Sequence, residues 1–81
     1  MVRNDGAETR KARIELVARV VTSLLYQNKD AGWIPLKSTV VKIMVQTGLT
    51  RFKVMEYLQL KDDEGIFELN ETEDRIKRAV E

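Results

Sequence analysis

The sequence predicts a single, mainly α-helical domain with a small β ribbon. Three patterns lead to this fold class: apolar residues recur at helical spacing over 7–28, two shorter helical runs flank the glycine at 48, and two short apolar segments lie outside the helices. With 81 residues, 43% of them hydrophobic, the chain can bury one small core. Residues 1–6 are predicted to be a flexible start, and residues 7–81 to form the domain.

The first helix is expected from residue 7 to about residue 28. Its apolar positions share one stripe at a period of about 3.6 residues, namely Ile14, Val17, Ala18, Val21, Leu24 and Leu25. Arg10 and Arg13 continue this stripe toward the N-terminus. A small domain without cysteine has no disulfide to reinforce it, and the stripe is broader than a three-helix core needs. We therefore expect a homodimer formed largely through this helix, assisted by the terminal segment, with Val17 and Val21 at the dimer interface.

An extended segment is predicted at 33–36. Pro35 fixes its own φ and pushes Ile34 toward the β region. Because proline cannot donate a ladder hydrogen bond, this segment should be an edge strand. The alternating stretch "IFEL" at 66–69 is predicted to pair with it.

Two shorter helices are expected between these strands. The second helix should begin with Ser38 or Thr39 as its cap and end at Gly48, which can take the left-handed conformation common at helix ends. Thr50 is expected to cap the third helix, which runs from residue 51 to about residue 63.

The last segment, 70–81, allows two interpretations. Asn70 with Glu73 three residues later resembles a capping box, and Ile76, Ala79 and Val80 would share one helical face. These features favour an extra C-terminal helix. In the alternative, "RIKRAV" at 75–80 is the return strand of a hairpin whose turn is "ETED".

Charge is unevenly distributed along the chain, although the net charge is only +1. Residues 1–40 carry a net charge of +3, residues 41–61 carry +3, and residues 62–81 carry −5. A basic body with an acidic end could meet a polyanion on one face. Ordinary solvated surface charge is the alternative.

The side-chain inventory excludes several kinds of site. The chain has no cysteine and no histidine, so Cys/His zinc sites, nucleophiles activated by histidine and histidine pH switches are excluded. The carboxylates at 62–64 are typical of a solvated helix end rather than an acid–base pair. We expect no enzymatic activity, no cofactor, no metal and no small-molecule ligand.

The N-terminal stretch does not resemble a signal peptide, and no apolar run approaches the roughly 18 residues of a membrane span. The expected location is the cytoplasm, in association with the nucleoid and without membrane insertion.

The stretch "WIPLKSTVVKIMVQTGLTRFKVMEYLQLKDDEGIFEL" at 33–69 resembles the winged helix-turn-helix family. Members commonly have a short strand, a helix ending in "TG", a leucine, a Ser/Thr cap, a second helix and a glycine followed by an apolar strand. The sequence is similar to the small regulators of this family found in archaea and their viruses and plasmids. If the terminal segment is helical, the wing is short or absent.

The resemblance implies a sequence-specific double-stranded DNA-binding protein, acting as a transcriptional regulator and as a homodimer. The third helix would enter the major groove and read bases with its first residues, which are Thr50, Arg51, Phe52 and Lys53. Lys37 and Ser38 would hold a DNA phosphate, assisted by backbone amides. Alternatively, Arg51 and Lys53 are solvated charges, and Phe52 belongs to the core or to a dimer contact.

Several positions depart from the family pattern. Met44 stands where a small residue is usual and Lys61 where a core leucine is usual, while Val41 and Val45 replace common polar residues. Glu56 would repel phosphates unless it accepts a hydrogen bond from cytosine or pairs with a neighbouring basic residue. A second hypothesis is a winged-helix protein–protein interaction module in a replication, transcription or membrane-remodelling assembly without DNA binding. It is favoured by Val41 and Val45, by Glu56 and by the acidic final 20 residues.

Overall fold

The computed structural model describes residues 5–79, with side chains from residue 9 onward. The elements in chain order are α1 (Asp5–Gln27), β1 (Trp33–Pro35), α2 (Leu36–Thr47), α3 (Arg51–Asp63), β2 (Phe67–Asn70) and β3 (Arg75–Arg78). The prediction of a mainly helical fold with a small sheet is confirmed. The flexible start predicted for 1–6 is wrong for residues 5 and 6, which belong to α1, and residues 1–4 lie outside the described residues.

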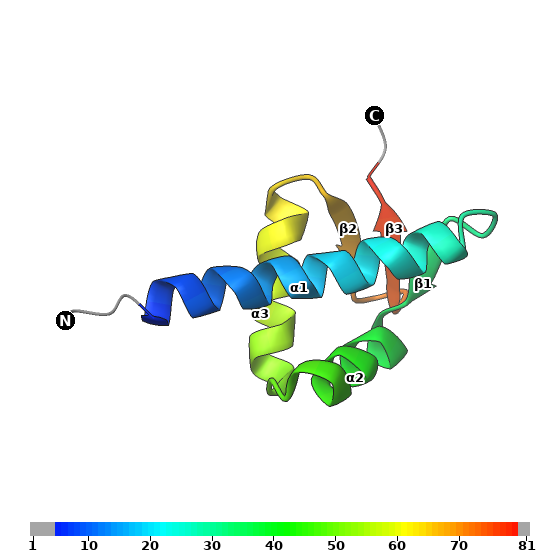
Figure 1. The fold of residues 1–81 in the computed structure, drawn as a ribbon. Coiled ribbons are helices and arrows are strands. Elements are labelled where there is room, and N and C mark those ends of the chain that lie inside the picture. The colour runs from blue at the N-terminus through cyan, green and yellow to red at the C-terminus, as the bar shows by residue number, and fades with distance from the viewer. Residues whose placement is uncertain (1–4, 80–81) are drawn as a thin grey trace.

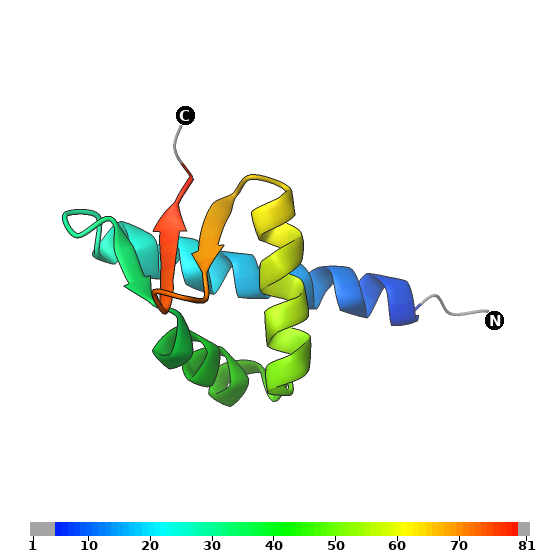
Figure 2. The same ribbon diagram turned by 180° about the vertical axis from the view of Figure 1, so that it is seen from behind.

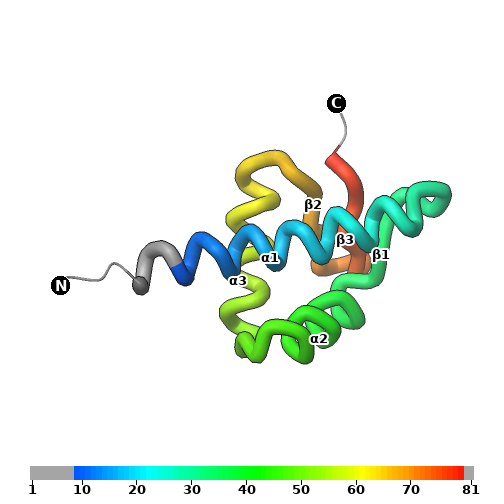
Figure 3. Tube along the Cα trace, in the orientation of Figure 1, coloured from blue at the N-terminus to red at the C-terminus, as the bar shows by residue number. Residues whose placement is uncertain are grey.

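The long helix α1 crosses the rest of the molecule. Its C-terminal half covers one face of the three-stranded sheet, and its middle crosses α3 (Figures 1 and 2). Its N-terminal turns extend past α3 on the side away from the sheet (Figure 3). This crossing brings Arg10 of α1 beside Glu56 of α3.

The core lies where α1 meets α2, α3 and the inner face of the sheet. Its fully buried side chains come in pairs from these elements: Val17 and Val21, Val40 and Ile43, Val54 and Leu58, and Phe67 and Ile76. Because α1 packs against both α2 and α3, the middle of its apolar stripe is used within one chain. The dimer contact predicted for Val17 and Val21 is therefore wrong, since neither residue exposes any surface.

The terminal segment forms a strand, so the predicted extra C-terminal helix is wrong. One of the two hydrogen bonds of a capping box is present, since the Glu73 amide donates to Asn70 Oδ1 at 2.9 Å. The second bond differs, because Glu73 Oε1 accepts from the Asn70 side chain, through Nδ2 at 3.0 Å. They close the turn 71–74 of a β2–β3 hairpin instead of starting a helix. The hairpin alternative is confirmed, because pairing buries Ile76 completely in the core.

Strand β3 lies in the middle of the sheet, whose order is β1-β3-β2. The predicted direct pairing of 33–36 with 66–69 is wrong, since both segments pair antiparallel with β3 instead. Ile76 stands opposite both Ile34 and Leu69, which places these apolar side chains on the inner face. The strand predicted to be at an edge because of Pro35 does lie at an edge.

The start of α2 is held by the hairpin turn. The helix begins at Leu36, so neither Ser38 nor Thr39 is its cap, and the amide of Leu36 donates to the backbone oxygen of Asp74 at 3.0 Å. The amide of Lys37 donates to Asp74 Oδ1 at 2.9 Å. A carboxylate at this end also interacts favourably with the helix dipole. Asp74 has a φ of 57°, so it reverses the chain while satisfying two free amides.

The substitution Asp74→Ala is expected to lower the free energy of unfolding by about 1–2 kcal/mol, because it removes a helix cap and places an alanine in the left-handed region. Urea denaturation measures this change. Asp74→Asn is the matched control, since asparagine tolerates a positive φ and its side-chain oxygen can accept the same hydrogen bond. Equal stability of the alanine variant and the wild type would contradict this role.

The connection between α2 and α3 follows the prediction. Gly48 has a φ of 76°, and its amide donates to the backbone oxygen of Met44 at 2.8 Å. Leu49 enters the core, and the Thr50 hydroxyl accepts from the amide of Lys53 at 3.2 Å. These three residues fix the angle at which α3 leaves α2.

A buried lysine links α1 to the end of α3. The Lys61 side chain is only 8% exposed, and its Nζ lies 3.4 Å from Glu15 Oε1 and 3.2 Å from Glu64 Oε1. The hydrogen bond to Glu64 raises the pKa of Lys61 above its ordinary 10.5; burial opposes this effect and the negative charge of Glu15 reinforces it. The charged lysine is therefore accommodated beside the core by two carboxylates at the protein surface.

This contact has a defined pH dependence. In the unfolded chain Lys61 titrates near 10.5, and in the folded chain at a higher pH. Its stabilising effect is therefore complete below pH 10.5 and is lost as the pH rises through the folded value. The stability of the wild type relative to Lys61→Met is expected to fall between about pH 8 and about pH 11. Urea denaturation at both pH values tests this, and an unchanged difference would contradict it.

Candidate nucleic-acid interface

The first turn of α3 is exposed. Arg51, Phe52 and Lys53 all face solvent, and Phe52 is 76% exposed, so it does not belong to the core. Thr50 is also exposed, but its hydroxyl already serves as the cap of α3. The structure therefore brings three of the four residues predicted to read bases together on one exposed basic and aromatic surface, and Thr50 caps the helix that carries them.

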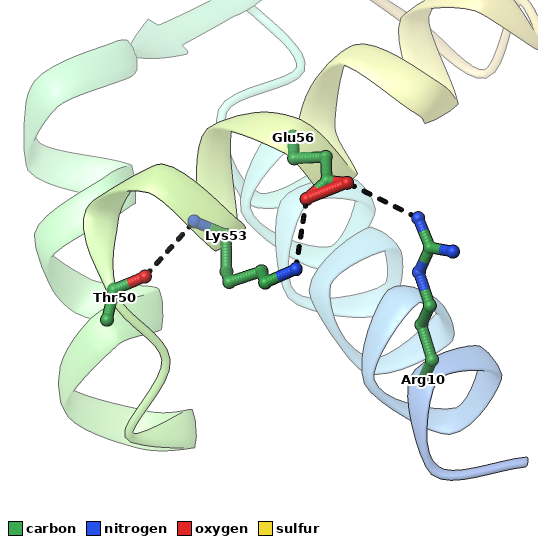
Figure 4. Close-up of polar contacts among 4 residues, drawn as sticks. All are labelled: Arg10, Thr50, Lys53 and Glu56. Carbon is green, nitrogen blue, oxygen red and sulfur yellow. Dashed lines mark hydrogen bonds and ion pairs between the residues drawn. The ribbon is translucent and has the colours of Figure 1, made fainter. Parts of the chain in front are cut away.

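Glu56 joins two basic residues from different helices. Its Oε1 lies 3.4 Å from Lys53 Nζ on α3, and its Oε2 lies 3.3 Å from Arg10 Nη2 on α1. Figure 4 shows the carboxylate between these two cations, further along α3 than the cap at Thr50. Lys53 is therefore paired within the protein rather than free.

Arg10 is a member of this surface that the sequence prediction missed. It lies on the same helical stripe as Ile14, Val17 and Val21, which packs toward the core, and so it faces α3 at the point where α1 passes it. The stripe was the available signal. It showed on which side of α1 Arg10 lies, but not which element lies opposite.

The charges of α3 balance within the helix. Arg51, Lys53 and Lys61 are its basic residues, and its acidic residues are Glu56, Asp62 and Asp63. Among the ion pairs of residues 9–79, Lys53 and Lys61 each take part, and Arg51 does not. Arg51 is thus the α3 cation that the described part of the chain leaves available to a partner.

The start of α2 differs from the predicted phosphate site. The side chains of Lys37 and Ser38 are exposed, as required. The Lys37 amide, however, donates to the carboxylate of Asp74. That carboxylate occupies the place where a phosphate was expected, so the amides of Leu36 and Lys37 are not available to assist one.

The hairpin carries opposite charges on its turn and its strand. Glu71, Glu73 and Asp74 make the turn acidic, which does not suit contact with phosphates. On the outer sheet face, which no described helix covers (Figure 2), the Arg75 guanidinium lies 4.3 Å from the ring centroid of Trp33. This cation–π contact occupies Arg75 within the protein.

Two valines on α2 form a separate exposed apolar surface. Val45 is 80% exposed and Val41 is 47% exposed, one turn apart on the same helix. The two valines that stand where polar residues are common therefore lie on the surface and are not buried in the core. Met44, in contrast, packs partly buried against the core.

No protein-family model matches this chain, and comparisons with curated proteins and with solved structures find no significant match. Within residues 5–79, no helix is both long and apolar enough to cross a membrane.

Proposed function

We propose that this protein is a winged helix-turn-helix protein that binds double-stranded DNA in a sequence-specific manner and regulates transcription. The observation that carries the proposal is the exposed first turn of α3, where Arg51 is available and Phe52 projects into solvent. The helix pair α2–α3 with its glycine turn, and the strand order β1-β3-β2, support the family assignment.

In this proposal α3 enters the major groove by its N-terminal end, since the groove is wide enough for a helix. Arg51 forms a bidentate contact with a guanine edge, and Phe52 contacts a thymine methyl group. Lys53 and Arg10 are positioned for phosphates once they exchange their contact with Glu56. The side chain of Lys37 adds a phosphate contact from α2.

The acidic turn at 71–74 cannot supply the backbone contact that a wing usually makes. In this proposal that contact comes from Arg10, because the N-terminal turns of α1 extend past α3 on the side opposite the sheet (Figure 2). The hairpin instead fixes the start of α2 through Asp74.

The homodimer is also part of the proposal, with the exposed side of α1 as its surface. Leu16 and Tyr26 are the exposed large apolar side chains of α1 among the described residues. A two-fold dimer would place two α3 helices on successive turns of the major groove.

The direct test is binding of the full chain to mixed-sequence duplex DNA across a salt series. A protein that neutralises several phosphates loses affinity steeply as salt increases. A steep slope supports DNA binding, and selection of bound duplexes then identifies the preferred sequence. Absence of binding at low salt would overturn the proposal.

A second candidate function is a protein-interaction module that does not bind DNA. Val45 and Val41 favour it, because they expose apolar surface on α2 that the monomer does not use. The balanced charge of α3 and the acidic hairpin turn agree with it. The same salt series separates the two candidates, since this second one requires no binding to duplex DNA.

A further inference from the structure

Glu56 stands at the centre of the proposed DNA-binding surface, where a negative charge is least expected. Its side chain is 33% exposed, and the cations beside it, Lys53 and Arg10, are 48% and 53% exposed. All three remain in contact with water. Exposed ion pairs of this kind are worth roughly 0–1 kcal/mol each, so a phosphate can readily replace the carboxylate as the partner of either cation.

The Glu56 carboxylate, unlike the two cations, cannot take a phosphate as a replacement partner. When a duplex covers the surface, Glu56 loses water and, if both cations turn to phosphates, it is left without a partner. An unpaired charge removed from water carries a large cost. In the major groove, the cytosine amino group is a hydrogen-bond donor that a glutamate can accept from, whereas guanine offers only acceptors there.

We propose that Glu56 determines the sequence selectivity of this surface, an inference that rests on the proposed DNA-binding function. On a non-cognate duplex, the carboxylate keeps Arg10 and Lys53 partly neutralised and thereby weakens binding to phosphates. On a cognate duplex, it accepts from a cytosine amino group, and both cations become available to the DNA backbone. The Glu56 side chain thus lowers the affinity for non-cognate DNA and favours duplexes with cytosine at one position.

The test is Glu56→Gln, which removes the charge and keeps the shape. Affinity for random duplex is expected to rise about eightfold at about 0.1 M salt, because one more released counterion steepens the salt slope by about 0.9. The preference of the selected duplex over random duplex is expected to fall. A second selection with the variant should show relaxed preference at one C·G pair.

The control is Asp30→Asn, which removes the same charge from an exposed residue of the turn that follows α1. That turn lies at the far end of α1 from its crossing with α3 (Figure 1). The control variant should leave affinity, salt slope and preference nearly unchanged. An equal rise in both variants would show an effect of net charge alone and would overturn the inference, as would an unchanged Glu56→Gln. Thermal unfolding followed by circular dichroism verifies that both variants fold.

The inference and the proposed function fail in different ways. If the wild type binds duplex DNA with a steep salt slope but Glu56→Gln behaves like the wild type, only the role of Glu56 is wrong. If the wild type does not bind duplex DNA at low salt, both are wrong.

Discussion

Val21→Glu is expected to unfold the protein. Val21 has no exposed surface and belongs to the core formed by all three helices and the sheet. A carboxylate at this position would be buried without a partner, which costs several kcal/mol. The total free energy of unfolding of a small domain is only about 5–15 kcal/mol. Far-UV circular dichroism and urea denaturation should show loss of helix content or a severely lowered midpoint.

Leu16→Glu is the matched control, because it introduces the same residue on the same helix at a side chain that is 38% exposed. It should retain the helix content of the wild type. If α1 forms the proposed homodimer, sedimentation equilibrium should show a dimer for the wild type and a monomer for Leu16→Glu. A folded Val21→Glu monomer would contradict the assignment of Val21 to the core of one chain. A wild-type protein that is monomeric at tens of micromolar would contradict the dimer.

Arg51→Ala is expected to weaken binding to the selected duplex by about 1–3 kcal/mol, or roughly 5- to 150-fold, and to relax preference at one base pair. The size follows from a bidentate contact with guanine. Arg51 is exposed and takes part in none of the ion pairs of residues 9–79, so its removal should leave the fold intact. Affinity for selected and random duplexes, measured side by side, checks the result.

Lys29→Ala is the control for Arg51→Ala, because it removes a cation from the turn after α1, where Lys29 lies over the ring of Tyr26. It should change neither affinity nor preference appreciably. If Arg51→Ala weakens binding equally on selected and random duplexes, Arg51 contacts a phosphate rather than a base. No change on either duplex would remove Arg51 from the interface.

Several elements could be predicted from the sequence because short-range chemistry decides them. The turn between α2 and α3 needs a left-handed residue and a hydroxyl cap, which Gly48 and Thr50 provide whatever surrounds them. The stripe of α1 follows from the helical period alone. Pro35 placed its strand at a sheet edge, because a proline has no amide to donate. The exposure of Arg51 and Phe52 could be predicted because they directly follow Thr50, the cap of α3.

Other features depend on contacts between residues far apart in the chain, and only the tertiary structure decided them. The Glu73 amide donates to Asn70 Oδ1 in the hairpin turn as it would at a helix start, so this bond cannot distinguish the two. The burial of Ile76 between β1 and β2 decides in favour of the strand. Likewise, the stripe that contains Val21 is apolar whether it meets a second chain or its own core.

The polar contacts between elements show the same limit. Arg10 and Glu56 are 46 residues apart, and they meet because α1 crosses α3 at one angle. Asp74 reaches the start of α2 because β3 lies beside β1. Local spacing determines which face of a helix a side chain occupies, whereas the packing of the elements determines what lies opposite that face. In this protein the helices and the turn between α2 and α3 were determined locally, whereas the start of α2 and the partners of the charged residues were determined by the fold.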